Sequence, residues 1–299
     1  MKTEGSNRLD ADEYDQLIKI ALREDLGGTI DLNRDITSAW TLKENLQAEA
    51  AIVSRQNGVI AGLEIAKSTF KHLDSEIDFS PHINDGDFVR SDDLIATLKG
   101  KAHPLLTAER TALNFLQHLS GIATATYYFV KAVKGTKAAI TDTRKTTPGW
   151  RRLEKWAVLQ GGGVNHRMGL HDVVLIKENH ATASKGLPAA IEQIRSFQTG
   201  NQRNIPLFVE VETLDQLDPV LKNHPDRIML DNMNIATLNT AVKHIRKSDS
   251  AITIEATGGY NLSTIREAAE TGVDLISVGS LTHSAPAFDL TLLFESAVD

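Results

Sequence analysis

The sequence contains no cysteine among its 299 residues. This absence excludes disulfide bonds, thiolate nucleophiles and zinc sites built on cysteine, and it is typical of a cytoplasmic protein. No window approaches eighteen uninterrupted apolar residues, so the sequence predicts no transmembrane helix and no membrane partner. The N-terminal stretch M-K-T-E-G-S-N-R-L-D lacks the apolar core of a signal peptide. We therefore expect a soluble protein located in the cytoplasm.

The sequence also lacks an excess of positive charge. Lys and Arg total 32 against 39 Asp and Glu, which gives a formal net charge of −7. A general nucleic-acid-binding protein carries a basic surface, so this balance argues against nucleic acid as a partner. Hydrophobic residues make up 41% and charged residues 24% of the chain. This ordinary globular composition, at this length, favours two domains of unequal size.

Residues 1–108 are predicted to form an N-terminal domain of helices and an antiparallel sheet. Apolar residues at helical spacing predict a helix over residues 10–25. From residue 48 short β-like runs follow, with turn signals at Asn57-Gly58 and at residues 84–86. A long helix is predicted after Pro104, with Thr107 as a candidate N-cap, and it is expected to join the two domains.

Beyond residue 135 the chain repeats a pattern of apolar β-run, loop and helix. The β-runs end near residues 142, 177, 210, 231, 256 and 279, and each interval leaves room for a crossover helix between parallel strands. Six such units predict a β/α barrel, placed at residues 109–285. The tail, residues 286–299, could form a strand or a short helix, and we expect it to pack back on the N-terminal domain.

Polar residues follow successive β-runs at the point where each ends. A single charged residue at a strand end marks contact with solvent about as often as it marks a functional site. Six such strand ends in succession favour a shared site, because a barrel gathers the ends of its strands on one face. Basic residues dominate the stretch 141–180 and predict an anion site, whereas Glu210 and Asp231 suit Mg²⁺ held through water. The glycine-containing loops E-A-T-G-G-Y and V-G-S-L-T-H suit a phosphate group, although ordinary turns would explain either one alone. Together they predict an acidic small molecule and a Mg-bound phosphorylated one.

Specific motifs give the chain a family resemblance. These are E-R-T-A-L-N-F-L-Q, T-D-T-R-K-T-T-P-G, G-G-G-V-N-H-R-M-G-L-H-D-V-V-L-I-K-E-N-H, V-E-V-E-T-L, I-M-L-D-N-M and E-A-T-G-G. Over nearly its whole length the sequence resembles the quinolinate phosphoribosyltransferases, which are type II phosphoribosyltransferases. The resemblance implies an α/β fold with an N-terminal α/β sandwich domain and a C-terminal incomplete, TIM-like β/α barrel. It also implies a homodimer with shared active sites, and higher assemblies of such dimers.

The implied reaction transfers a phosphoribosyl group from 5-phosphoribosyl 1-pyrophosphate to quinolinate with decarboxylation. Its products are nicotinate mononucleotide for NAD synthesis, CO2 and pyrophosphate. The resemblance assigns the two quinolinate carboxylates to a set of basic residues: Arg144, His166, Arg167, Lys177 and, from the partner subunit of the dimer, Arg110. It assigns the catalytic groups to three residues: Lys145 facing the phosphorylated sugar, and Glu210 and Asp231 facing the ribose and Mg²⁺.

The remaining assignments concern the phosphate groups. The resemblance implies that six residues surround the phosphate groups: Thr257, Gly258, Gly259, Gly279, Ser280 and His283. The family usually reads Ser-Gly-Gly where this chain has Thr257-Gly258-Gly259, so an additional methyl group must fit beside the phosphate.

Two other functions remain open from the sequence. One is a barrel aldolase or isomerase in which Lys177 forms a Schiff base with a phosphorylated carbonyl compound. The other is a non-catalytic or repurposed relative that retains the pocket. No H-E-x-x-H or comparable spacing occurs, so the histidines predict no zinc site.

Overall fold

The computed structural model describes residues 9–202 and 204–298, with the side chains of 295–298 excepted. The chain divides into two compact units. The first comprises residues up to 127, residues 147–162 and residues from 284 onwards, and the second comprises residues 128–146 and 163–283. The expected domain boundary at residues 108/109 lies inside helix α4 (Ala102–Ala132).

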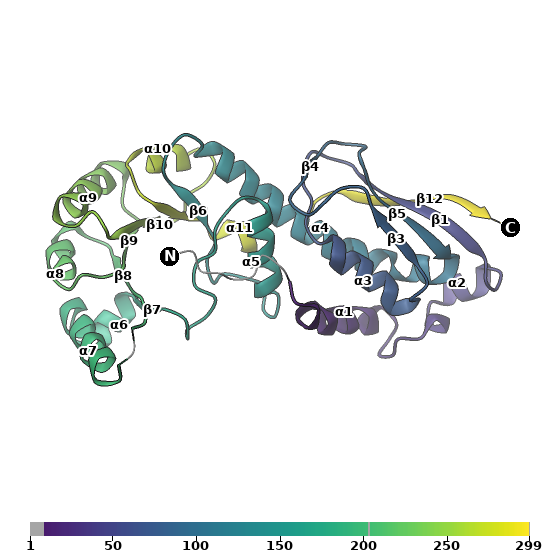
Figure 1. Cartoon of the computed structure of the whole chain (residues 1–299), viewed down its shortest axis with the longest axis horizontal. Helices are drawn as coiled ribbons and strands as arrows, with labels where there is room; N and C mark the ends of the chain where they lie inside the picture. The colour runs from purple at the N-terminus through teal and green to yellow at the C-terminus, as the bar shows by residue number, and fades with distance from the viewer. Residues whose placement is uncertain (1–8, 203, 299) are drawn as a thin grey trace. The chain divides into compact units, whose positions relative to one another are not determined.

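The first unit is built on a four-stranded antiparallel sheet in the order β12-β1-β5-β3. Its strands are β1 (Gln47–Ser54), β3 (Asp78–Pro81), β5 (Leu94–Lys101) and β12 (Leu290–Val298). A separate antiparallel pair consists of β2 (Gly58–Val59) and β4 (Phe88–Val89). The C-terminal segment, left open by the sequence between strand and helix, is thus the edge strand that pairs with β1 (Figure 1).

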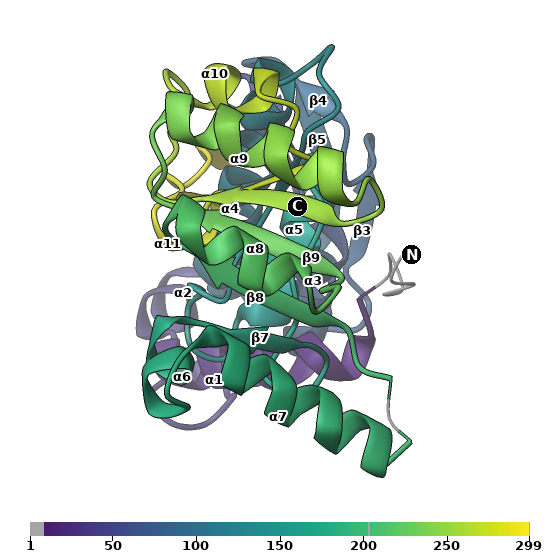
Figure 2. The same cartoon turned by 90° about the vertical axis from the view of Figure 1, so that its left-hand side faces the viewer.

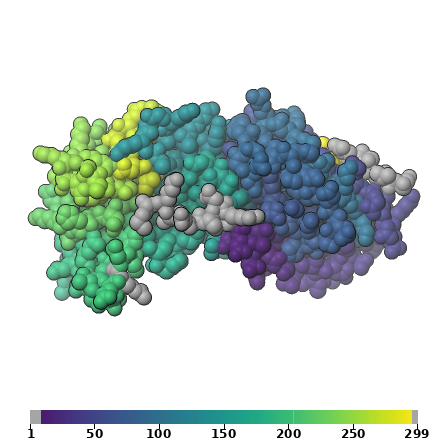
Figure 3. All heavy atoms as spheres, viewed as in Figure 1, coloured from purple at the N-terminus to yellow at the C-terminus, as the bar shows by residue number. Residues whose placement is uncertain are grey.

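Helices supply the other layer of this unit. They are α1 (Ala11–Asp25), the 3-10 helix η1 (Leu32–Arg34), α2 (Ile36–Thr41), α3 (Leu63–Leu73), α4 and α5 (Arg151–Gln160). Phe70 of α3 and Leu105 of α4 share a buried core with Ile52 of β1 and Leu98 of β5. Figure 3 shows α1, in purple, close-packed beside the blue segments of the same unit. The expected α/β sandwich is confirmed.

The second unit contains a six-stranded sheet in which every pair is parallel, in the order β6-β11-β10-β9-β8-β7. Its strands are β6 (Ala139–Thr141), β7 (Val174–Ile176), β8 (Leu207–Val211), β9 (Arg227–Asp231), β10 (Thr253–Thr257) and β11 (Leu275–Ser277). Within the described part of the chain, β6 and β7 are not paired with each other, so the ring is incomplete. The expected incomplete β/α barrel is confirmed.

Helices alternate with these strands. They are α6 (Glu178–Ala183), α7 (Leu187–Gly200), the 3-10 helix η2 (Leu214–Gln216), α8 (Leu217–Leu221), α9 (Ile235–Ser248), α10 (Ile265–Glu270) and α11 (Ser280–His283). Figure 2 shows α7, α8 and α9 in front of β7, β8 and β9, on the outer side of the sheet. Among the described residues, no helix combines the length and apolarity needed to cross a bilayer.

Candidate functional site

A cavity of about 540 Å³ opens in the second unit, where the six parallel strands end. Each strand contributes a lining residue or is followed by one. Eleven residues predicted from the sequence line this cavity: Arg144, Lys145, His166, Arg167, Lys177, Glu210, Asp231, Thr257, Gly258, Gly259 and Gly279. The parallel topology therefore assembles in one place residues that are up to 135 positions apart in the sequence, from Arg144 to Gly279.

Three predicted residues do not belong to this lining. Arg110 is exposed on α4 in the first unit. Ser280 and His283 are the first and last residues of α11, directly after Gly279. A Cβ atom built on Gly279 would lie 3.2 Å from Cδ of Lys145 and 3.3 Å from Nε2 of His283. His283 and Lys145 thus both lie close to this glycine at the cavity edge.

One wall of the cavity is cationic. Arg144 belongs to the loop after β6 and Arg167 to the loop before β7, and both residues line the cavity. Burial lowers the pKa of Arg167 from its ordinary value, and the charge of Arg144 lowers it further. Because the two like charges repel each other, this wall is suited to an anion with more than one negative charge.

The loop that contains Arg167 is held by a carboxylate that the sequence did not single out. The backbone N–H groups of Met168 and Gly169 donate to Asp172 at 2.5 and 3.2 Å. Burial opposes the charge of Asp172, yet these hydrogen bonds keep its pKa below the ordinary value. Nη1 of Arg167 also donates to the carbonyl of Val173 at 3.3 Å. The arginine is therefore fixed both through its backbone and through its side chain.

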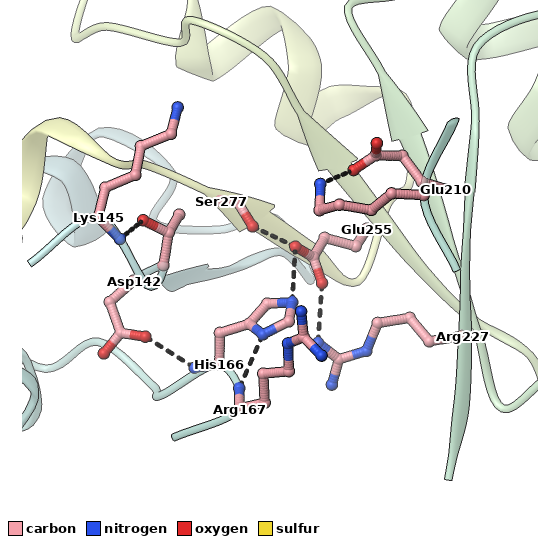
Figure 4. Close-up of polar contacts among 10 residues, drawn as sticks. Asp142, Lys145, His166, Arg167, Glu210, Arg227, Glu255 and Ser277 are labelled. Carbon is pink, nitrogen blue, oxygen red and sulfur yellow. Dashed lines mark hydrogen bonds and ion pairs between the residues drawn. The ribbon is translucent and has the colours of Figure 1, made fainter. Parts of the chain in front are cut away.

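Lys145 is held through its backbone. Its N–H donates to Oγ1 of Thr143 at 3.0 Å, and its carbonyl accepts from Oγ1 of Thr282 at 2.7 Å. Figure 4 shows its side chain extending away from the cluster formed by His166 and Glu255. A fixed backbone with an extended side chain allows the ammonium group to reach into the cavity.

Two carboxylates also line the cavity, and this part of the lining is called the carboxylate wall. Glu210 at β8 forms an ion pair with Nζ of Lys177, which follows β7. Asp231 is the last residue of β9 and accepts from Nδ2 of Asn232 at 2.9 Å. Lys177 is therefore paired with a carboxylate of the cavity, although the sequence grouped it with the arginines.

Five lining residues were missed by the sequence reasoning: Thr143, Leu175, Met229, Asn232 and Ser277. Leu175 and Met229 form an apolar cluster with Phe208, and nothing in an apolar β-run distinguishes lining residues from core. Ser277 did leave a signal, because it is a polar residue inside the apolar run D-L-I-S-V. Asn232 adopts a left-handed backbone conformation with φ 52°, which asparagine tolerates better than most residues.

The glycine pair after β10 packs against Asn232. Gly258 has φ +112°, and a Cβ atom on it would lie 2.3 Å from Oδ1 and 2.9 Å from Cα of Asn232. Gly259 has φ +55°, and a Cβ atom there would have no heavy atom within 4 Å. The N–H of Asn232 donates to the carbonyl of Thr257 at 2.9 Å and ties the ends of β9 and β10 together.

This contrast predicts unequal effects of two otherwise matched substitutions. Gly259→Ala should lower the free energy of unfolding by about 1–2 kcal/mol, because alanine must adopt a left-handed backbone conformation there. Gly258→Ala should cost clearly more, and should also weaken phosphate-ligand binding, because the new methyl group must displace Asn232 beside Asp231. Urea denaturation and ligand titration of both variants test this expectation. Equal losses in the two variants would contradict the role of Gly258 as a close-approach residue.

Comparisons with known proteins find relatives over nearly the whole chain. The model of the quinolinate phosphoribosyl transferase C-terminal domain matches residues 122–293, and that of the N-terminal domain matches residues 35–120. The nicotinate-nucleotide pyrophosphorylase [carboxylating] of Mycobacterium leprae (strain TN) is 40% identical over 277 residues, which cover 92% of this chain and 95% of the relative. The chloroplastic enzyme of that name from Arabidopsis thaliana is 38% identical over 294 residues, covering 94% and 82%. The solved nicotinate-nucleotide pyrophosphorylase from Francisella tularensis has a TM-score of 0.89 and 36% identity, covering 97% of this chain and 98% of that chain.

Proposed function

Since this chain belongs to the quinolinate phosphoribosyltransferase family, we propose that it makes nicotinate mononucleotide for NAD biosynthesis from quinolinate and 5-phosphoribosyl 1-pyrophosphate. CO2 and pyrophosphate are the other products. The observation that carries the proposal is the cavity itself, which is lined by cationic residues, two carboxylates and a glycine loop. Such a division of charge suits a dicarboxylate acceptor and a phosphorylated sugar donor.

Quinolinate would bind at the cationic wall. Arg144 and Arg167 repel each other in the absence of an anion, and two carboxylates would relieve that repulsion. Each charge-assisted hydrogen bond contributes about 1.5–3 kcal/mol, so several are needed to remove a dianion from water. Lys177 adds a third positive charge, and Arg110 of a partner subunit would add a fourth. His166 would complete this wall.

Mg²⁺ fits the carboxylate wall as a substrate-linked ion. Among the described residues no group of three or more His, Asp or Glu side chains could hold a metal ion alone. Mg²⁺ commonly binds one or two carboxylates together with waters and substrate phosphates. Glu210 and Asp231 are the residues that would hold it, and when bound it would neutralise negative charge on the pyrophosphate.

The carboxylates also suit the charge that develops on the sugar. As the bond from C1 of the ribose to the pyrophosphate breaks, with its electron pair leaving on oxygen, C1 becomes positive. Glu210 and Asp231 stabilise this charge while the pyridine nitrogen donates its lone pair to C1. The ring becomes cationic and can accept the electron pair released when the adjacent carboxylate leaves as CO2, after which that carbon takes up a proton. Lys145 would hold the pyrophosphate or stabilise this ring carbon.

The phosphate groups would lie on the side of the two glycine loops. Backbone N–H groups can approach a phosphate closely where glycine leaves no side chain in the way. We assign to this part of the site Thr257, Gly258, Gly259, Gly279, Ser280 and His283.

We further propose a homodimer, or a higher assembly of dimers, in the cytoplasm. The exposed position of Arg110 on α4 is compatible with contributing its guanidinium to a partner's cavity. The absence of cysteine suits a reducing compartment.

A turnover experiment tests the function. The protein, quinolinate, 5-phosphoribosyl 1-pyrophosphate and Mg²⁺ are mixed, and loss of quinolinate is followed together with release of CO2. We expect one CO2 per quinolinate consumed, and no turnover after chelation of Mg²⁺. Turnover of nicotinate in place of quinolinate would move the assignment to a sister transferase. Trapping of Lys177 by borohydride with a phosphorylated carbonyl compound would instead support the Schiff-base alternative.

A further inference from the structure

A buried ionic cluster lies directly behind the cavity wall. Glu255 on β10 has no exposed surface, and its Oε2 accepts from Nη1 of Arg227 at 2.8 Å. Its Oε1 accepts from Oγ of Ser277 and lies 3.6 Å from Nε2 of His166 (Figure 4). Glu255 does not line the cavity, whereas Ser277 and His166 do. The carboxylate therefore reaches the ligand space only through these neighbours.

A hydrogen bond to the His166 ring identifies the nitrogen that accepts. Nδ1 accepts from the backbone N–H of Arg167 at 2.7 Å, so this nitrogen carries no proton. A neutral imidazole that accepts at Nδ1 carries its proton on Nε2, the nitrogen that faces Glu255. The backbone of His166 is fixed as well, because its N–H donates to Oδ1 of Asp142 at 2.9 Å. Glu255 thus faces the one ring position that can donate.

Phe208 completes the cluster and fixes its geometry. The Arg227 guanidinium lies 4.1 Å from the centre of the Phe208 ring, and the His166 ring meets the same phenyl group edge-on with centroids 5.9 Å apart. Arg227 also compensates the charge of Glu255. An uncompensated carboxylate behind an anion-binding wall would repel the dianion, so the pair places an oriented acceptor there without a net negative charge.

We propose that Glu255 is a positioning residue for the quinolinate side of the site. Its carboxylate lies 3.6 Å from Nε2 and orients the His166 imidazole by electrostatic attraction to that nitrogen. Nδ1 then receives the backbone N–H of Arg167 and sets the Arg167 guanidinium at the cavity wall. The inference rests on the proposed function for its substrate. The orientation of His166 itself can be measured without turnover.

The substitution Glu255→Gln separates this role from a purely electrostatic one. Removing a negative charge behind the wall would by itself favour an anion, so an electrostatic role predicts a lower KM for quinolinate. Loss of orientation predicts a higher KM for quinolinate. A side chain displaced by about 1 Å can lower the reaction rate on the order of 100-fold, so misplaced binding groups are costly. We expect the KM for quinolinate to rise at least about tenfold, with the KM for 5-phosphoribosyl 1-pyrophosphate within about twofold of the unsubstituted protein.

The imidazole nitrogen-15 shifts of His166 provide the second measurement, assigned by their loss in His166→Gln. In the ligand-free wild type we expect the tautomer with the proton on Nε2, and in Glu255→Gln a mixture of tautomers. An unchanged tautomer in Glu255→Gln would overturn the proposal even if the wild type showed no activity with quinolinate. A lower quinolinate KM, or an equal rise in both KM values, would overturn it as well.

Two further variants guard against a general loss of structure. Glu255→Gln leaves Arg227 buried without its counter-charge, so the double variant Arg227→Met with Glu255→Gln removes both charges and should keep the fold. The double variant should reproduce the mixed tautomers and the raised quinolinate KM. Arg246→Gln is the matched control, since Arg246 pairs with Asp274 away from the cavity lining. It should leave both the His166 tautomer and both KM values unchanged.

Discussion

Replacing Arg144 with alanine is expected to raise the KM for quinolinate by about 10- to 150-fold, the equivalent of one charge-assisted hydrogen bond of about 1.5–3 kcal/mol. The guanidinium would contact a carboxylate both before and during the reaction, so kcat should change much less than KM. The free energy of unfolding should also change little. Removing Arg144 removes its repulsion with Arg167, whose pKa is lowered by burial and by this neighbouring charge.

Steady-state kinetics with each substrate varied in turn, together with urea denaturation, test this expectation. Arg152→Ala provides the control, because Arg152 forms an ion pair with Glu13 and its side chain is largely exposed. The control should leave both KM values unchanged. An unchanged quinolinate KM in Arg144→Ala, or an equal rise for 5-phosphoribosyl 1-pyrophosphate, would remove Arg144 from the carboxylate clamp.

The barrel was predictable because its strands carry a signal in the sequence. Continuous apolar runs separated by helical intervals are required where both faces of a parallel sheet are buried. The observed strands end within two residues of the expected positions, as with β9 at Asp231 and β11 at Ser277. Residues in the loops that follow the runs, such as Lys145 and Lys177, could therefore be placed at the cavity from topology.

The cluster behind the cavity could not be predicted in the same way. Glu255 lies in the middle of β10, where it contacts Arg227 at the first residue of β9 and Ser277 of β11. Such a contact depends on the register between strands, with Glu255 opposite Met229 and Leu275, and periodicity within one strand carries no information about register. The contact between Gly258 and Asn232 depends in the same way on two strand ends that are adjacent only in the folded barrel.

Asp231 is expected to give the largest loss of turnover among the carboxylate substitutions. Asp231→Asn keeps the volume of the side chain but removes the charge that would stabilise the positive ribose. Loss of one preorganised electrostatic group commonly lowers kcat by about 100- to 1,000-fold. The fold should survive, because Asp231 lies at the end of β9 beside the cavity and accepts a hydrogen bond from the neighbouring Asn232 side-chain amide.

The measurement is kcat at saturating substrates across a titration of Mg²⁺. We expect kcat to remain low at every Mg²⁺ concentration. The Mg²⁺ concentration needed for half of the residual activity should rise, because one of the two carboxylates that would bind the ion is lost. The matched control is Asp218→Asn, an exposed carboxylate on α8 that pairs with His244, and it should behave as the unsubstituted protein. Full recovery of kcat at high Mg²⁺ would show that Asp231 acts only in holding the ion. A change confined to the KM for quinolinate would place Asp231 on the acceptor side of the cavity and would reverse the division of the two walls.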